Sequence, residues 1–386
     1  NQCDTFGSIE DEITLGLVIR NNFCFLSFPD FDPFALVSVD AYNIGYSLVG
    51  PLLVSFVSWL VDQAQEDGVD HLYFLSREGS LLKQVYDLWC EDKDSVPISH
   101  YLILSRRAAS VAAITSREDI FSIARVEFYP NSLESFLYIR FGLDLDNDVW
   151  IRIERELGWN RNQIIQVQNE DIANLVPLLT ALEGEISNRA VKEREGLLHY
   201  LTENQLEVSR KPAVVDIGYG GSVQGYLNKL TGQYIHGYYL LTNDRADKMA
   251  QTYNVLARGC FYENLKKASN MPSLYRYSFY LEKLVTINEP QIQYYEQQPD
   301  GTRKSIYRNL HEEEITSNKV LKRIHEGVID FAKEAITIRQ TLKDFRPSID
   351  ISRLLIEEFL SRLSSKEENF LSKIIIDDYY CGRGLV

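Results

Sequence analysis

The stretch PAVVDIGYGGSVQG, residues 212–225, has the composition of a phosphate-binding turn. An apolar run and a single acid, Asp216, precede three glycines and a serine. A strand that ends in a glycine-rich turn and opens a helix presents backbone N–H groups to an anion at the positive end of the helix dipole. The spacing matches neither GxGxxG nor GxxxxGK[ST], which argues against a dinucleotide site and a P-loop. The predicted phosphate contacts are Gly218, Tyr219, Gly220, Gly221, Ser222 and Gln224; the alternative is that the glycines serve close packing alone.

A second polar turn follows an earlier apolar run and has different chemistry. The residues concerned are Ser76, Arg77, Glu78 and Gly79 after the run HLYFL, with Arg106 and Arg107 after the next apolar run. The planar guanidinium group makes bidentate contacts with phosphate or diphosphate, so the three arginines are predicted to form a local basic cluster. The alternative is that each arginine is a solvated surface residue.

Both turns lie in segments with the pattern strand, turn, helix, strand, which predicts parallel strands joined by crossovers. The predicted strands are 71–75, 101–105, 213–216 and 234–241, and the predicted helices are 80–89 and 223–230. The carboxyl ends of such strands form the crevice where open α/β sheets bind ligands. The fold class is therefore expected to be α/β and Rossmann-like, with a mostly parallel sheet.

The remainder of the chain is predicted to be mainly helical. Residues from about 108 to 210 show helical patterns and no convincing strand, which predicts a large helical insertion in a donor-binding core at 1–245. Residues 246–386 are predicted to form a mixed and then helical region, on the acceptor side or as packing. Short extended pieces are expected at 254–263 and 291–296, a loop at 297–305, and helices from about residue 312.

Composition narrows the function classes. The net charge of −15 argues against a general nucleic-acid binder, so a phosphate ligand must meet a local basic cluster. The five cysteines lack CxxC spacing and fit free thiols in a reducing compartment. The apolar run LLVSFVSWLV, residues 52–61, is shorter than the roughly 20 residues of a membrane span and is expected to be a buried core helix. No signal peptide is visible, although the chain begins without methionine.

The succession of motifs resembles a known family. The two turns together partly resemble phosphoribosyltransferases, although a single acid, Asp216, stands where those enzymes usually have two. A closer resemblance, over roughly residues 40–245, is to the glycan phosphoribosyltransferase domain of bacterial ribofuranosyltransferases, where aspartate is more usual than Glu78. The motifs that carry it are NIGYSLVGPLL (43–53), LYFLSREGSLL (72–82), YLILSRRA (101–108), VVDIGYGGSVQGYL (214–227) and IHGYYLLTND (235–244).

The resemblance implies transfer of 5-phosphoribose from 5-phosphoribosyl diphosphate (PRPP) to a sugar hydroxyl of a bacterial O-antigen or capsule glycan, giving a β-ribofuranoside 5-phosphate by inversion. It also implies a lipid-linked glycan acceptor at the cytoplasmic face of the membrane and a separate dehalogenase-like phosphatase as partner. The chain itself is not expected to be that phosphatase, because Asp40 in VSVDAYN lacks a second acid two residues later.

Phosphoribosyl transfer requires anion stabilisation at the leaving diphosphate and a base near the incoming hydroxyl. The arginines are expected to hold the diphosphate, with Mg²⁺ as the accompanying cation. Asp216 is expected to contact the ribose hydroxyls or a magnesium-bound water. Asp40 and Glu78 are the leading candidates for the base, Glu282 is a weaker candidate for acceptor contact, and the alternative for all four is a solvated or salt-bridged acid.

Two other functions remain open from the sequence. A nucleotide-sugar-dependent glycosyltransferase is the alternative enzyme, although no acidic DxD-type metal motif lies near a strand end. A non-catalytic glycan-binding or scaffold module that keeps a phosphate-binding fold is the alternative outside enzymes.

Overall fold

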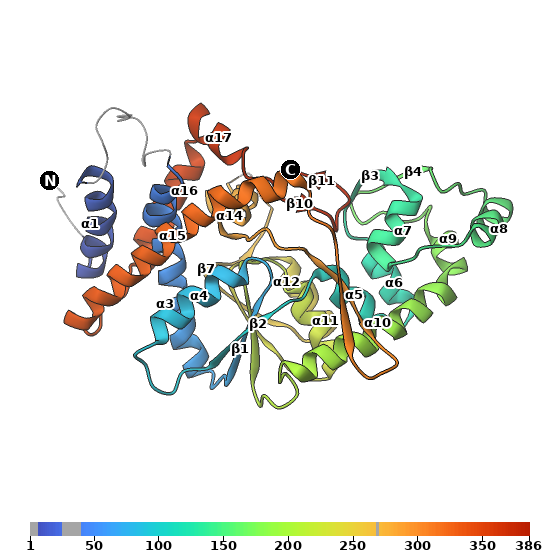
Figure 1. Cartoon of the computed structure of the whole chain (residues 1–386), viewed down its shortest axis with the longest axis horizontal. Helices are drawn as coiled ribbons and strands as arrows, with labels where there is room; N and C mark the ends of the chain where they lie inside the picture. Colours follow the sequence, from blue (N-terminus) through green and yellow to red (C-terminus); the bar gives the residue numbers. More distant parts are fainter. Residues whose placement is uncertain (1–6, 25–39, 268–269) are drawn as a thin grey trace.

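The computed structural model describes residues 7–24, 40–267 and 270–386 of the chain. Its centre is a five-stranded, all-parallel sheet in the order β2-β1-β5-β6-β7, covered by helices on both faces (Figure 1). The α/β, Rossmann-like fold class predicted from the sequence is therefore confirmed. The strands of the sheet are β1 (His71–Leu75), β2 (Ile98–Leu102), β5 (Pro212–Asp216), β6 (His236–Asn243) and β7 (Leu256–Leu265).

The strands are apolar because helices cover both faces of the sheet. Every residue of β1 and β6 is buried. The predicted strand at 101–105 corresponds to β2, which begins and ends earlier. It ends at Leu102 because the next backbone N–H groups donate to side chains and not to a neighbouring strand. The N–H of Ile103 donates to the Tyr200 hydroxyl at 2.8 Å, and the N–H of Leu104 donates to Ser76 Oγ at 3.1 Å.

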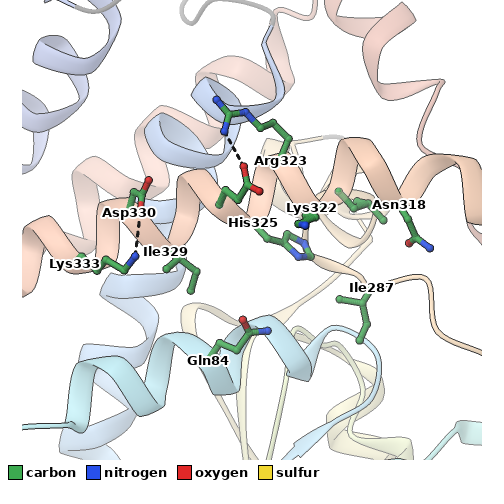
Figure 2. A pocket seen from close by; sticks show the side chains of 11 residues that line it. Gln84, Ile287, Asn318, Lys322, Arg323, His325, Ile329, Asp330 and Lys333 are labelled. Atoms are coloured by element: carbon green, nitrogen blue, oxygen red, sulfur yellow. Dashed lines mark hydrogen bonds and ion pairs between the residues drawn. The ribbon is translucent and has the colours of Figure 1, made fainter.

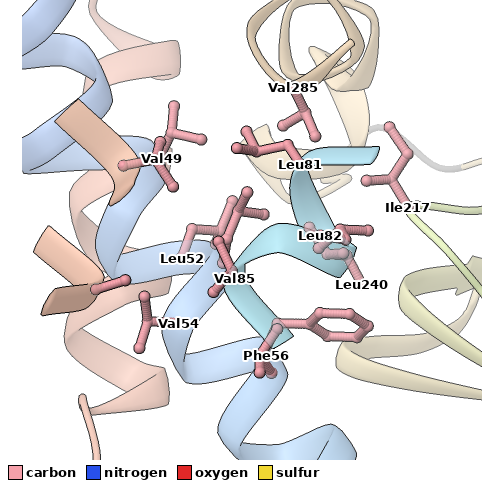
Figure 3. Close-up of a cluster of buried hydrophobic side chains, with 14 of the residues drawn as sticks. Val49, Leu52, Val54, Phe56, Leu81, Leu82, Val85, Ile217, Leu240 and Val285 are labelled. Atoms are coloured by element: carbon pink, nitrogen blue, oxygen red, sulfur yellow. The ribbon is translucent and has the colours of Figure 1, made fainter. Parts of the chain in front are cut away.

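One face of the sheet packs against helices from both ends of the chain. Helix α3 (Gly50–Glu66) and helix α4 (Gly79–Cys90) lie against it, and Figure 3 shows Leu52, Val85 and Leu240 meeting in this core. The long helix α15 (Glu312–Thr341) and helix α16 (Ile349–Ser361) complete the layer, together with α1 (Ile9–Cys24), α2 (Ala41–Ile44) and the π-helix η2 (Gly45–Val49).

The helical run Ala41–Glu66 is the one described segment long and apolar enough to cross a membrane, and 94% of its apolar window is buried inside the protein. It therefore packs as a core helix, as predicted for residues 52–61.

The opposite face of the sheet packs against α5 (Arg106–Ala112), α10 (Glu183–Glu203) and α11 (Ser222–Thr231). Side chains from these helices meet inward-facing residues such as Tyr73 and Val214 in a second core. Helix α12 (Arg245–Tyr253) then connects β6 to β7.

The predicted insertion has a hydrophobic core of its own, separate from the two cores at the sheet. Its elements are α6 (Arg117–Ala124), α7 (Leu133–Phe141), α8 (Asn147–Leu157), α9 (Val176–Ala181), β3 (Phe128–Ser132) and β4 (Ile164–Val167). The expectation that this region contains no strand is wrong, because β3 and β4 pair antiparallel. Each is short and β3 contains Pro130 and Asn131, so neither has the long apolar alternation that marks a strand in sequence.

The sheet continues past residue 245, because the extended piece expected at 254–263 is its fifth strand, β7. Within the loop expected at 297–305, residues 298–302 form the turn of a hairpin between β8 (Ile292–Gln297) and β9 (Arg303–Tyr307). The helical region predicted from about residue 312 is confirmed. Its neighbours are α13 (Ser273–Arg276), α14 (Ser278–Val285), α17 (Ser365–Leu371) and the short strands β10 (Asp377–Asp378) and β11 (Gly384–Leu385).

Candidate functional site

The sheet places the two predicted turns side by side. The chain passes from β1 to β2 on one side and then returns to β5 on the other side of β1, so β1 and β5 flank the point where the strand order reverses. Ligands of open α/β sheets bind outside the carboxyl ends of the strands at this point. The turn Ser76–Gly79 and the turn Ile217–Gly221 both begin there.

The turn after β5 leads directly into α11. Gly221 is the N-cap of α11 with φ +66°, and no side chain caps the first N–H groups of that helix. The N–H of Asn243 donates to the carbonyl of Tyr219 at 3.0 Å and ties the turn to β6. The uncapped helix start, with Ser222 as its first residue, has the donors of the predicted phosphate site.

The same glycines also serve packing. A Cβ on Gly221 would lie 3.0 Å from Val255 Cγ1, and one on Gly220 would lie 2.8 Å from the Cβ of Arg245. The structure therefore supports the packing role of the glycines, and phosphate binding stays a prediction. Gln224 is buried and fully engaged, because its amide donates to the carbonyls of Ile235 and Leu256 and accepts from the Tyr239 hydroxyl. Its place is structural, between α11 and strands β6 and β7.

The turn after β1 is fixed by its own backbone and by β2. Ser76 Oγ accepts from the N–H of Leu104, and Glu78 Oε2 accepts from the N–H of Arg77 at 3.1 Å. Gly79 packs against Phe74, where a Cβ would meet the strand backbone at 2.7 Å. The peptide bonds Ser76–Arg77 and Gly218–Tyr219 are both cis.

Arg77 is a partly buried cation with spare hydrogen-bonding capacity. Its Nη1 is buried without a hydrogen-bond partner among the described residues and lies 4.0 Å from Glu314 Oε1. Both Glu314 oxygens are taken by Arg308, at 2.7 and 2.8 Å. Arg77 therefore remains a candidate for an anionic ligand.

The two consecutive arginines have different surroundings. Arg107 is buried, makes a bidentate ion pair with Glu193 of α10, and donates to the carbonyl of Gln293 at 2.8 Å. Arg106 lies instead close enough to Asp216 and Glu282 for its charge to lower the pKa of both carboxyls. The cluster of three arginines predicted from the sequence is thus reduced to Arg77 and Arg106, because Arg107 is neutralised within the protein.

Glu78, Asp216 and Glu282 come together from the first turn, the end of β5 and helix α14. Burial, followed by the charge of Glu78, raises the pKa of Asp216 well above its usual value. The same two causes raise the pKa of Glu282 to about 7. Burial and nearby negative charge both favour the protonated form of a carboxyl group. Raised pKa values of this kind are typical of catalytic acids and bases that work at neutral pH.

Tyr219 lies against Glu282 and Ser278, and its pKa is raised well above the usual value, first by burial and then by the charge of Glu282. The Tyr219 ring contacts the Tyr275 ring edge-on, with 6.0 Å between ring centres. The turn after β5 is thus in contact with helices α13 and α14, far along the chain.

Asp40 lies apart from this cluster of carboxylates. Its carboxylate caps α2 by accepting from the N–H groups of Tyr42 and Asn43 at 3.0 and 3.2 Å, and its charge acts on Arg323 of α15. Because the side chain is exposed and serves as a helix cap, the structure gives no support to Asp40 as the base.

The segment 377–382 adds residues to the site that sequence reasoning did not single out. The charge of Asp378 contributes to the raised pKa of Glu282. The Cζ of Arg106 lies 5.6 Å from the centre of the Tyr380 ring, and the Cζ of Arg140 lies 4.2 Å from it. Cys381 is a free thiol whose pKa is raised to about 11 by burial and by Asp378.

Arg140 is immobilised as a support for Tyr380. It is fully buried, and its guanidinium donates to the carbonyls of Ile123, Val126 and Glu127. The ring of Tyr380 therefore links a fixed cation in the insertion to Arg106 in the candidate site. A separation of more than 230 residues in the chain hides this contact from any local sequence pattern.

Carboxylates near one another could contribute a ligand to a hard divalent cation held mainly by a bound diphosphate. The charge of Glu78 acts on both Asp216 and Glu282, and that of Asp378 acts on Glu282; carboxylate oxygens are the ligand type that Mg²⁺ prefers. A separate group of potential metal ligands consists of His311, Glu314 and Asp377, whose ligand atoms lie within 4.8 Å of one another. That group is already compensated, because Arg308 pairs with both carboxylates.

The other cysteines are not part of this site. Cys90 and Cys260 are free thiols, and burial is the first cause of the raised pKa of each. Cys3 and the side chain of Cys24 lie outside the described residues.

Comparison of the chain with protein-family models and with curated proteins finds no match.

Proposed function

We propose that the chain is a glycan phosphoribosyltransferase that moves 5-phosphoribose from PRPP to a sugar hydroxyl of a bacterial surface glycan. The observation that carries the proposal is the juxtaposition, at the switch point of the sheet, of an arginine-bearing turn after β1 and an uncapped glycine turn after β5. A donor with a phosphate at one end and a diphosphate at the other needs two anion sites held at a fixed separation. The two turns offer both.

The 5-phosphate is assigned to the start of α11, where the N–H groups after Gly221 and the hydroxyl of Ser222 are donors. The diphosphate is assigned to Arg77 and Arg106. Asp216, at the end of β5, is assigned to contact the ribose hydroxyls. Arg107 and Gln224 support these groups without contacting the donor.

In the transfer, the acceptor oxygen forms a bond to ribose C1 as the bond between C1 and the diphosphate oxygen breaks. The acceptor hydroxyl loses its proton to a base on the opposite face of the ribose, which gives inversion from the α donor to a β product. We assign this base to Glu282 in place of Asp40, because its pKa of about 7 leaves a large fraction ionised at neutral pH while keeping useful basicity. Glu78 remains the second candidate.

Mg²⁺ bound with the donor would be held by diphosphate oxygens together with Glu78 or Asp216, and it would neutralise charge on the leaving diphosphate. The arginines orient the diphosphate, and the carboxylates keep the ribose and the acceptor in place. Partial burial of these side chains strengthens each interaction relative to water.

The cellular setting follows from the same resemblance to bacterial ribofuranosyltransferases. The acceptor is proposed to be lipid-linked at the cytoplasmic face of the membrane, and the 5-phosphate that remains on the product requires a separate phosphatase.

The test is a transfer assay with PRPP, Mg²⁺ and a set of synthetic glycan acceptors, in which the phosphoribosylated glycan and released diphosphate are measured. We expect equal amounts of the two products, and loss of both in Glu282→Gln. Consumption of a nucleotide sugar with no phosphoribosylated product would assign the chain to nucleotide-sugar glycosyltransferases. Tight glycan binding without turnover of either donor would make it a binding module.

A further inference from the structure

A groove with a volume of about 590 Å³ lies between α4 and α15, outside the site described above. Figure 2 shows His325, Ile329 and Lys333 on α15 above Gln84 on α4. Its lining runs from Asn318 to Lys333 along α15, a length of about 22 Å at the rise of an α-helix. The groove is therefore elongated, with the proportions of an extended chain.

One end of the groove adjoins the candidate site. Asn318 is one helical turn beyond Glu314, which lies 4.0 Å from Arg77. Ile287, also in the lining, is two residues before Glu289, whose carboxylate is close enough to Glu78 and Arg77 to feel both charges. A ligand lying in the groove would thus end near the turn after β1.

The charges in the lining nearly cancel. Arg323 pairs with Glu326 at 2.7 Å, and Lys333 pairs with Asp330 at 3.3 Å, both within the groove (Figure 2). Lys322 is the remaining cation of the lining, and burial lowers the pKa of His325 to about 4, which keeps the ring neutral. Such a lining does not favour a polyanion.

The lining also has spare hydrogen-bonding groups over an apolar floor. In the described part of the chain, the Asn318 amide and Lys322 have no hydrogen-bond partner, and His325 Nε2 is buried without one. Leu321, Ile329 and Ile287 supply the apolar surface. Amide, ammonium and carboxylate groups around a narrow apolar strip match the hydroxyl rim and the C–H face of a sugar chain.

We propose that this groove binds the acceptor as a linear, neutral oligosaccharide, with its reacting end toward Glu282 and Arg77. The proposal rests on the proposed function for the identity of the chain as an acceptor. The groove itself is a binding site that can be tested without any transfer reaction.

The probe is an array of linear oligosaccharides, with neutral and with acidic or phosphorylated members, to which the intact protein is applied. We expect binding to neutral linear chains, with affinity rising with length up to the span of the groove. The double substitution Asn318→Ala/Lys322→Ala should weaken that binding by about tenfold, since each lost hydrogen bond costs a few fold. The matched control is Thr252→Ala, in a cavity of about 790 Å³ between α6, α11 and α12, which should leave glycan binding unchanged.

Absence of binding to every neutral chain would overturn the proposal, as would binding confined to acidic chains or binding that the double substitution leaves intact. Calorimetry with PRPP and Mg²⁺ on the same preparation separates the two ideas. Donor binding without glycan binding would contradict the proposal for the groove and leave the proposed function standing. Glycan binding without donor binding would support the groove as a glycan site and contradict the proposed transferase function.

Discussion

Glu282 is the residue with the sharpest chemical signature in the candidate site. Its pKa of about 7 lies above the value of an unfolded chain, so the folded protein holds a proton that the unfolded chain has lost between those two values. The free energy of unfolding should therefore fall as the pH rises toward and through about 7. The ionised form that serves as the base appears over the same interval.

We predict that Glu282→Gln abolishes transfer and yet raises the free energy of unfolding by ~1–2 kcal/mol at about pH 8, with little change at about pH 5. Thermal melts followed by circular dichroism across this range measure the effect. The control Glu154→Gln, an exposed acid on α8, should change neither property. An equal effect of Glu282→Gln at both pH values would contradict the raised pKa.

Tyr380 is predicted to position Arg106. The substitution Tyr380→Leu removes the ring between Arg140 and Arg106, and Arg106 then moves away from the carboxylates. Because Arg106 lowers the pKa of Glu282, that pKa should rise further, by ~0.5 unit or more. Carboxyl ¹³C NMR of labelled glutamate, assigned with Glu282→Gln, measures it.

Tyr380→Phe is the matched control, since it keeps the ring and should keep the titration of Glu282 as in the parent. If Tyr380 has only a structural role, Tyr380→Leu should lower the stability and leave the titration of Glu282 unchanged. That result would contradict the positioning role.

Arg107 joins helix α5 to helix α10 on one face of the sheet. Removal of one partner of a buried ion pair leaves an uncompensated charge, so Arg107→Met should lower the free energy of unfolding by ~3–5 kcal/mol. The exposed pair of Arg117 with Glu183 is the control, and Arg117→Met should cost ~1 kcal/mol or less. Urea titrations compare the two. A small loss in Arg107→Met would free that arginine to be a ligand group after all.

The start of α11 needs a substitution that separates packing from ligand binding. Gly221→Val would be strained at φ +66° and would crowd Val255, so it should destabilise the fold by ~1–3 kcal/mol whether or not phosphate binds there. Ser222→Ala changes only the hydroxyl and should weaken PRPP binding a few fold at unchanged stability. Donor calorimetry and melting curves together show whether the turn is a ligand site. Unchanged PRPP affinity in Ser222→Ala would show that the Ser222 hydroxyl does not contact the donor.

Local patterns in the sequence predicted most of these elements. Strands β1 and β5 and helices α4, α10 and α11 are each specified by an apolar run or a helical spacing within a short window. Strands β3 and β4 were missed because they are short and half-exposed, and their pairing depends on the insertion's own core. The extent of β2 differs because Tyr200 and Ser76, distant in sequence, take its next N–H groups.

For the whole molecule, the chain topology decides which of the predicted site residues meet. The strand order places β1 beside β5 in a parallel sheet, and it brings Glu78 and Asp216 to one edge. Glu282 and Asp378 reach this edge from positions separated from Glu78 by more than half of the chain, and the charges of Glu78 and Asp378 both act on Glu282. No local pattern distinguishes them from solvated acids, and none shows that the Asp40 carboxylate caps α2.

The segment that bears Tyr380 also connects the insertion to the site. The N–H of Tyr129 donates to the carbonyl of Cys381 at 2.8 Å, and the Asn131 amide donates to the carbonyl of Gly382 at 3.3 Å. The β3 region and the switch point of the sheet are thus joined through one short stretch of chain.

We propose that the two turns at the switch point form one site for PRPP. The direct measurement is isothermal titration calorimetry of PRPP with Mg²⁺ into the intact protein, beside Arg106→Ala and a panel of nucleotide sugars. We expect one donor molecule bound per chain, at least tenfold weaker binding in Arg106→Ala, and no comparable binding of nucleotide sugars. Absence of PRPP binding, or PRPP binding that is untouched by Arg106→Ala, would contradict this proposal.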